Sequence, residues 1–90
     1  MPRFIIERNI PQAGDWSDEE ADDVTAKSEE VLANLPDVQW QLSYVVDDKL
    51  YCVYDAPDAE SVNEHARRGG FPADKVSEVR RIIDPTSGGR

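Results

Sequence analysis

The sequence predicts an α+β domain of the ferredoxin-like type, in which a four-stranded antiparallel sheet carries two helices on one face. Two runs rich in β-branched and aromatic residues flank an Asp-Asp-Lys break at residues 47–49, which is typical of a β-hairpin. One helical pattern precedes this hairpin and another follows it, and a further β-rich segment lies near each end of the chain. Two β-α-β halves with right-handed crossovers then give the order strand-helix-strand-strand-helix-strand.

The first half of the chain contains a strand, a helix and a second strand. The β-rich segment 3–10 ends at a proline, which cannot donate to a sheet. Ser17 and Glu20 have the spacing of a capping box, and apolar residues at spacings of three and four continue the helix to Leu35. Residues 38–46 then alternate between apolar and other side chains, which predicts a strand. The apolar face of this strand is predicted to consist of Val38, Trp40, Leu42, Tyr44 and Val46.

The second half begins with the partner strand of the hairpin, predicted over residues 50–54. Pro57 and Asp58 suit the start of a second helix, because proline fits its first turn and a carboxylate complements the helix dipole. The pair Gly69-Gly70 favours a left-handed residue that ends this helix. Residues 75–83 are predicted to form the last strand.

Composition limits the classes of function. The formal net charge of −9 argues against nucleic acid and anionic membranes as partners, because both are bound through basic surfaces. No apolar run approaches the length of a membrane span, and the N-terminal segment becomes acidic too early for a secretory signal. A single cysteine cannot form an internal disulfide. We expect a cytoplasmic protein with one domain over residues 1–85 and a flexible tail over residues 86–90.

The predicted sheet has one face without helices, and that face is apolar. The first strand carries Phe4 and Ile6 on one side and Ile5 on the other, and the last strand repeats this pattern with Val79 and Ile83 against Ile82. A large apolar face is unfavourable in water, and a second copy of the chain is the usual cover for it. We therefore expect a homodimer that forms through the open sheet face.

Several motifs together resemble a small bacterial family of mostly unknown function. The resemblance is carried by Glu7-Arg8, Trp40 with Ser43-Tyr44-Val45, the block from Tyr51 to Pro57, His65, Gly70-Phe71-Pro72 and Val76-Ser77-Glu78-Val79. That family includes a nickel-binding actinobacterial protein and is similar to the dimeric α/β-barrel group. The resemblance implies a ferredoxin-like protomer, a dimer, and binding of Ni²⁺ or another divalent transition metal. It implies no particular set of ligands.

His65 is the only histidine, and imidazole is the commonest nitrogen ligand of transition metals. It shares a helix face with Val62 and Ala66, so a structural histidine that points at the sheet is the competing interpretation. Glu7 and Glu78 are candidate carboxylate ligands on sheet strands, although an ion pair with Arg8, Arg80 or Arg81 is the simpler explanation for such residues.

Cys52 is a candidate soft ligand, and a small hydrophobic role is its alternative. The metal hypothesis therefore names His65, Glu7, Glu78 and Cys52.

A different class of function is an enzyme of the dimeric α/β-barrel type, such as a cofactorless monooxygenase or an isomerase. Trp40, Tyr44 and Tyr54 would line a pocket between the sheet and the helices, with His65 as the acid or base. We favour a small acidic dimer that binds a divalent transition metal, and the position of His65 relative to a pocket is the feature that separates the two hypotheses.

Overall fold

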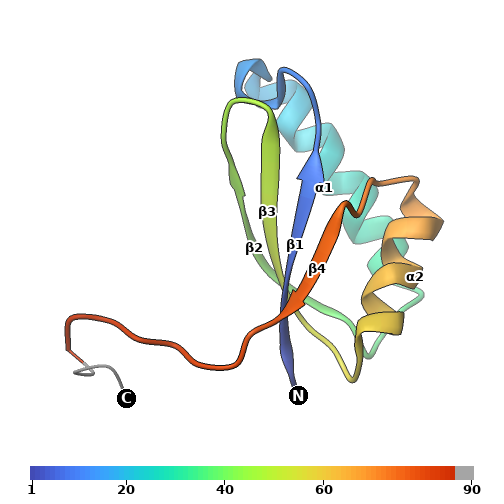
Figure 1. The fold of residues 1–90 in the computed structure, drawn as a ribbon. Helices are drawn as coiled ribbons and strands as arrows, with labels where there is room; N and C mark the ends of the chain where they lie inside the picture. The colour runs from blue at the N-terminus through green and yellow to red at the C-terminus, as the bar shows by residue number, and fades with distance from the viewer. Residues whose placement is uncertain (87–90) are drawn as a thin grey trace.

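The computed structural model describes residues 1–86 and has the predicted order of elements. These elements are β1 (Arg3–Asn9), the short 3-10 helix η1 (Ala13–Asp15), α1 (Asp18–Leu32), β2 (Gln39–Val45), β3 (Lys49–Asp55), α2 (Ala59–Gly69) and β4 (Lys75–Glu78). The strands form one antiparallel sheet in the order β2-β3-β1-β4, with both helices on one face (Figure 1). This arrangement confirms the ferredoxin-like α+β fold. Residues 87–90, which make up most of the predicted tail, lie outside the described residues.

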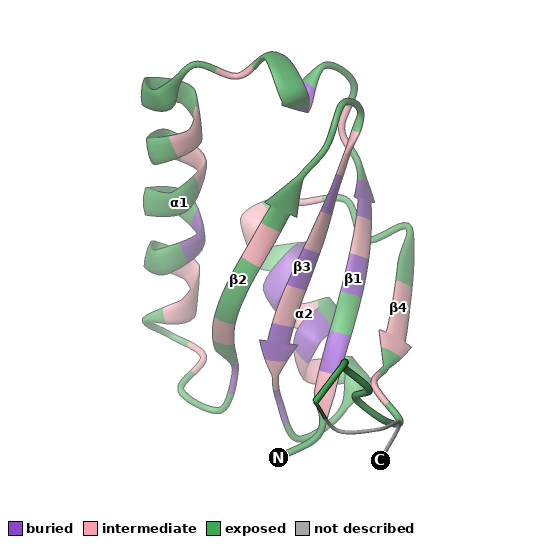
Figure 2. Cartoon of the chain, turned by 90° about the vertical axis from the view of Figure 1, so that its left-hand side faces the viewer, coloured by how far each residue is buried: buried purple, intermediate pink, exposed green. Residues whose placement is uncertain are grey.

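The two central strands, β1 and β3, form the middle of the core. Phe4 lies opposite Tyr54 and Ile6 lies opposite Cys52, and all four side chains are buried. Residues directly opposite each other in an antiparallel pair point to the same side of the sheet. This side faces the helices, where the fully buried Val62 of α2 joins the same cluster (Figure 2). The alternation of buried and less buried residues along both strands is the period of two that a half-covered sheet requires.

Strand β2 contains a bulge between Trp40 and Leu42, and this bulge corrects the predicted face of the strand. Trp40 pairs with a helix-facing residue of β3, whereas Leu42 and Tyr44 pair with residues that face the other way. The extra residue shifts the alternation by one, so that Ser43 and Val45 face the helices instead. Leu42 and Tyr44 are accordingly 43% and 62% exposed on the open face of the sheet.

Helix α1 begins with the predicted capping box. The Glu20 backbone N–H donates to the Ser17 hydroxyl at 3.1 Å, and the Ser17 N–H donates back to the Glu20 carboxylate at 3.4 Å. The helix ends at Leu32, before the predicted end at Leu35, and the chain then forms a turn in which the Leu35 N–H donates to the Leu32 carbonyl. Ser28 is the buried residue of α1, so this helix lies against the sheet without being sunk into it.

Helix α2 is capped by side chain and backbone at its two ends. The Asp58 carboxylate accepts from the Ser61 N–H at 2.8 Å, and Gly70 adopts the left-handed conformation with φ of 70°. A Cβ at Gly69 would collide with the Phe71 ring, which folds back onto the end of the helix. Within residues 1–86, no helix is long and apolar enough to cross a membrane.

Strand β4 stops at Glu78, although the strand was predicted to continue to Ile83. It pairs with β1, and Arg3, the first residue of β1, accepts from the Val79 N–H at 2.7 Å. Residues 80–86 have no strand opposite them, so their apolar content does not extend the sheet. The chain from there to residue 86 extends away from the sheet (Figure 1).

Replacing Ser17 with alanine should lower the free energy of unfolding by about 1 kcal/mol, because one backbone donor at the start of α1 loses its acceptor. Ser17→Asp should restore most of this stability, since aspartate caps equally well. Urea denaturation of the three proteins measures the effect. A stability of Ser17→Asp as low as that of Ser17→Ala would contradict the capping role.

Candidate functional site

A pocket of about 150 Å³ lies between α1 and the helix-facing side of the sheet. Most of its wall is apolar and includes Trp16, Val24, Trp40 and Leu50. The polar residues that line it are Arg8, Thr25, Ser28, Ser43 and Tyr54. No acidic side chain of the described residues lines it. The pocket therefore combines an apolar interior with one positive charge.

Arg8 is 2% exposed although it carries a full positive charge. It follows Phe4 and Ile6 in the alternation of β1, and this parity directs its side chain toward the helices. Its guanidinium donates to the Pro72 carbonyl at 2.5 Å and to the Tyr54 hydroxyl at 3.3 Å. It also lies 5.9 Å from the centre of the Tyr54 ring and 5.5 Å from that of Phe71. Among residues 1–86, no carboxylate forms an ion pair with Arg8.

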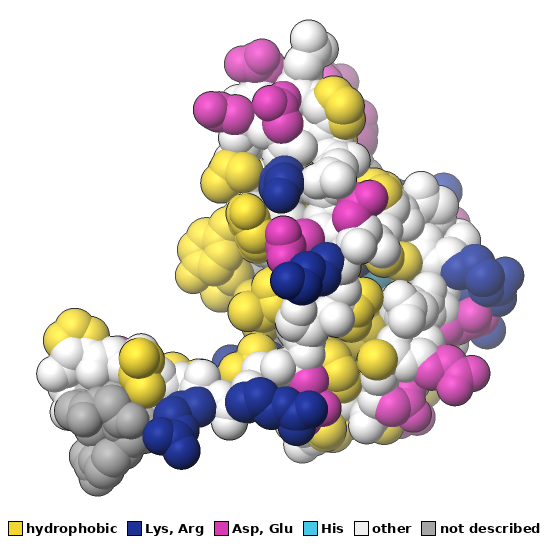
Figure 3. Space-filling view, in the orientation of Figure 1, with side chains coloured by type: hydrophobic (Ala, Val, Ile, Leu, Met, Phe, Trp, Pro, Cys, Tyr) yellow, Lys and Arg dark blue, Asp and Glu magenta, His cyan; other side chains and the backbone are white. Residues whose placement is uncertain are grey.

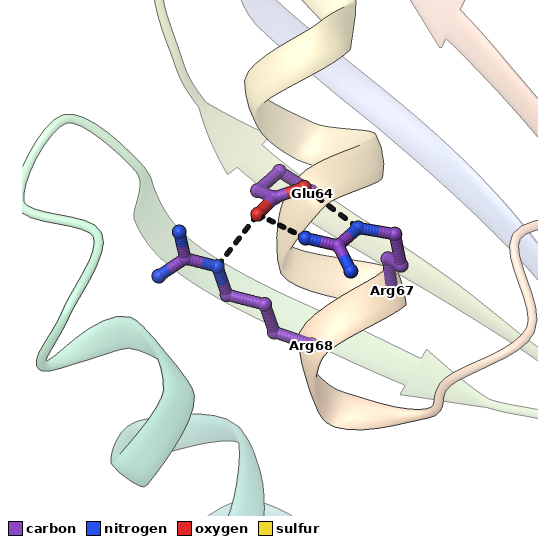
Figure 4. A network of polar contacts seen from close by, with 3 residues as sticks. All are labelled: Glu64, Arg67 and Arg68. Atoms are coloured by element: carbon purple, nitrogen blue, oxygen red, sulfur yellow. Dashed lines mark hydrogen bonds and ion pairs between the residues drawn. The ribbon is translucent and has the colours of Figure 1, made fainter.

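Other arginines of the structure have carboxylate partners. Arg3 forms two hydrogen bonds with Asp55, at 2.7 and 3.1 Å. On the exposed side of α2, Glu64 accepts from both Arg67 and Arg68 at 2.6 Å (Figure 4). Those two arginines lower the pKa of the Glu64 carboxyl to about 2. Among residues 1–86, the buried guanidinium of Arg8 thus lacks the kind of carboxylate partner that Arg3, Arg67 and Arg68 have.

His65 is fully buried next to this arginine. Its Nε2 lies 3.2 Å from the Ser28 hydroxyl, and its ring packs against Tyr54 and Phe71, with centroid distances of 5.1 and 5.5 Å. Its Nδ1 is buried without a hydrogen-bond partner. Burial, and secondarily the positive charge of Arg8, lower the pKa of His65 to about 4. The imidazole is therefore neutral at neutral pH.

The structure does not bring the predicted metal ligands together within one protomer. Glu7 lies on the open face of the sheet and forms an ion pair with Lys49 at 3.7 Å, whereas His65 is on the opposite side. Glu78 lies at the end of β4, where Arg80 is 3.6 Å away. Within residues 1–86, no three His, Cys, Asp or Glu side chains are grouped closely enough to hold a metal ion.

Of the residues predicted to line a pocket, Trp40 and Tyr54 line this one, whereas Tyr44 lies on the open face because of the bulge in β2. Cys52, predicted as a metal ligand, also lines the pocket. Arg8 was considered as an ion-pair partner for a glutamate, and its role in the pocket wall was missed. The sequence did indicate this role, because Arg8 alternates in step with Phe4 and Ile6 along the strand and therefore points to the same side of the sheet.

Ser28 was also missed as a polar group of the pocket, although it belongs to the apolar stripe of the first predicted helix. In both cases a polar residue at a core-facing position was the available sign.

The fold and this pocket define a small ferredoxin-like domain with one covered and one open sheet face. The family model described as "Nickel responsive protein SCO4226-like" matches residues 4–79. The chain belongs to this family. Among solved structures, the crystal structure of SCO4226 from Streptomyces coelicolor A3(2) has a TM-score of 0.77 to this chain at 18% sequence identity. The match covers 90% of this chain and 99% of that one, and it shows the shared fold. No curated protein matches the sequence at a significant level.

The burial of neutral His65 predicts a loss of stability in mild acid. Between pH 6.5 and about 4 the unfolded chain binds a proton at His65 that the folded chain excludes. Stability is therefore fully present above pH 6.5 and falls by up to about 3 kcal/mol toward pH 4. Urea denaturation as a function of pH measures this loss. A His65→Phe variant should show a flatter profile in this window, and an equal slope in both proteins would contradict the assignment.

Proposed function

We propose that the protein is an acidic cytoplasmic homodimer that binds Ni²⁺ or a neighbouring divalent transition metal. The observation that carries this proposal is its membership of a family described as nickel responsive. A response to nickel requires a step that recognises the ion, and direct binding by the small domain itself is the simplest such step. The net charge of −9 supports it, because an acidic surface raises the local concentration of cations.

His65 is the side chain that we propose as the nitrogen donor. Its Nδ1 has no hydrogen-bond partner, and its neutral state leaves a lone pair that needs no deprotonation before it binds a metal. The remaining donors do not fit a site preassembled around it in one protomer, since no suitable group of three lies within residues 1–86 and Arg8 adds a positive charge nearby. Metal binding at His65 would thus require its buried surroundings to open and further donors to approach.

The proposed dimer forms through the open face of the sheet. The strand registers place Ile5, Val53 and Leu42 side by side in one row, and Tyr51 and Tyr44 in the next. Figure 3 shows hydrophobic side chains gathered on the flank that this face occupies in the view of Figure 1. Exposed apolar surface of this kind marks an interaction site, and a second copy supplies a matching surface.

The charges on this face also favour a second copy. Arg3 forms an ion pair with Asp55, and Glu7 forms one with Lys49, so these four charges are paired within the face. The face is consequently close to neutral in a protein whose net charge is −9, so that two copies meet there with little repulsion.

The alternative is an enzyme of the dimeric α/β-barrel type, and the pocket lined by Trp40 and Tyr54 is the observation that favours it. His65 supports this alternative weakly. It does not line the pocket but contacts Ser28 and Tyr54, which do, and its low pKa makes it a poor base at neutral pH. The geometry thus favours binding in the pocket over acid-base catalysis by His65.

Replacing His65 with alanine should weaken binding of Ni²⁺ by at least about tenfold, or about 1.4 kcal/mol, because the carboxylates that remain favour harder ions. Isothermal titration of tag-free protein measures this affinity, and circular dichroism checks the fold. Binding to the unaltered protein should persist until the pH approaches 4, where protons begin to occupy the imidazole.

Asp22→Asn is the matched control, since it removes an exposed carboxylate of α1 and leaves His65 intact. Its affinity for Ni²⁺ should equal that of the unaltered protein. An unchanged affinity in His65→Ala would assign the binding to loose collection of cations by the acidic surface. Absence of Ni²⁺ binding by the unaltered protein would overturn the proposed function and leave the pocket-based alternative.

The unaltered protein should sediment at about twice its 10.1 kDa chain mass at micromolar concentration. Leu42→Glu should shift it to the monomer, because a buried charge without a partner is unfavourable within an apolar interface. Ala26→Glu, on the exposed side of α1, introduces the same charge elsewhere and should remain dimeric. A monomeric unaltered protein, or a dimeric Leu42→Glu variant, would contradict the proposed interface.

A further inference from the structure

We propose that the pocket beside Arg8 binds a small organic anion: a monocarboxylate with a compact apolar body, its carboxylate on the Arg8 guanidinium. This proposal does not depend on metal binding or on the enzyme alternative.

The charge of Arg8 is the first reason to expect an anion in this pocket. Arg8 is 2% exposed, its side chain carries a full positive charge, and it has no carboxylate partner among residues 1–86. Burial of an ion without a counter-ion is costly, and the energy is recovered when an opposite charge reaches it. The pocket gives a ligand access to this position, because Arg8 lines its wall. The same charge opposes a metal ion or an ammonium group there.

The hydrogen-bonding groups around Arg8 are the reason to expect a carboxylate. Arg8 uses two donors toward Pro72 and Tyr54, so the other N–H groups of its planar fork have no acceptor within the described chain. A carboxylate matches such a fork with two parallel hydrogen bonds. Burial raises the pKa of the Tyr54 phenol, which keeps its hydroxyl protonated, and both Tyr54 and Ser28 line the pocket. The Tyr54 hydroxyl thus offers a neutral donor beside one positive charge.

The size and lining of the pocket define the rest of the ligand. An apolar cavity of about 150 Å³ is large enough for benzene, and the pocket here has about that volume. Its walls include two indole rings, those of Trp16 and Trp40, together with Val24 and Leu50. One ring, or a branched chain of similar size, fills this space and leaves one polar end for Arg8. A single guanidinium balances a single negative charge, which favours a carboxylate over a doubly charged phosphate.

Isothermal titration of the full chain in the presence of a metal chelator tests the proposal with three probes that share a phenyl ring. Benzoate should bind at least about tenfold more tightly than benzyl alcohol, which has the same ring without the charge, and than phenyl phosphate. The indole N–H signals of Trp16 and Trp40 should shift in the NMR spectrum upon addition of benzoate. Equal affinity for benzoate and benzyl alcohol, or tighter binding of phenyl phosphate, would overturn the proposal.

Variants of the protein then test whether Arg8 is the residue that binds the carboxylate. Arg8→Gln should abolish the preference for benzoate over benzyl alcohol, whereas Arg80→Gln, which removes an exposed arginine, should keep it. A retained preference in Arg8→Gln would overturn the proposal. Should Arg8→Gln fail to fold, Val24→Phe fills the pocket from α1 and leaves Arg8 in place. It should lose benzoate binding, and unchanged binding in that variant would also overturn the proposal. Because a chelator is present throughout, these results leave the nickel proposal untested in either direction.

Discussion

The burial of the Arg8 guanidinium is the constraint around which the covered side of this domain is arranged. Its hydrogen bonds join β1 to Tyr54 of β3 and to the Pro72 carbonyl in the segment after α2. The ring of Phe71, in that same segment, lies beside it and packs on His65. One charged side chain thus holds three separate parts of the chain in contact. A buried charge is expensive, and these contacts offset only part of that cost.

Burial and, secondarily, the same charge explain the neutral state of His65. His65 lies in the core close to a permanent cation, and both burial and that cation lower its pKa. Its neutral imidazole is compatible with the packed rings of Tyr54 and Phe71, whereas an imidazolium would place a second positive charge in the same core. The covered side is therefore electrostatically suited to anions, and any bound cation must either disrupt this arrangement or bind elsewhere.

The order of elements could be predicted from the sequence because it rests on local signals: a capping box at Ser17, a hairpin break at residues 47–49, and a left-handed glycine at position 70. The side of the sheet to which each residue of β2 points could not be predicted, because a bulge depends on pairing with another strand and has no local signal in this segment. The end of β4 likewise depends on where β1 begins. For the site, Trp40 and Tyr54 could be assigned to a pocket from residue type, whereas Trp16 and Phe71 were not singled out. The role of Arg8 required knowing that no carboxylate among residues 1–86 pairs with it.

The net charge of the protein acts against an anionic ligand at long range and not at the pocket itself. A surface with a net charge of −9 slows the approach of any anion, and salt screens that repulsion over distances of about 10 Å. The attraction of Arg8 operates at contact, inside a pocket where the lower dielectric makes it stronger and where salt screens it less. Association of a carboxylate should therefore become faster as salt is added, while its dissociation changes little. This is the opposite of the behaviour expected for a cation collected by the acidic surface, whose binding weakens with salt. The direction of the salt effect thus separates a ligand held by Arg8 from one held by the surface charge.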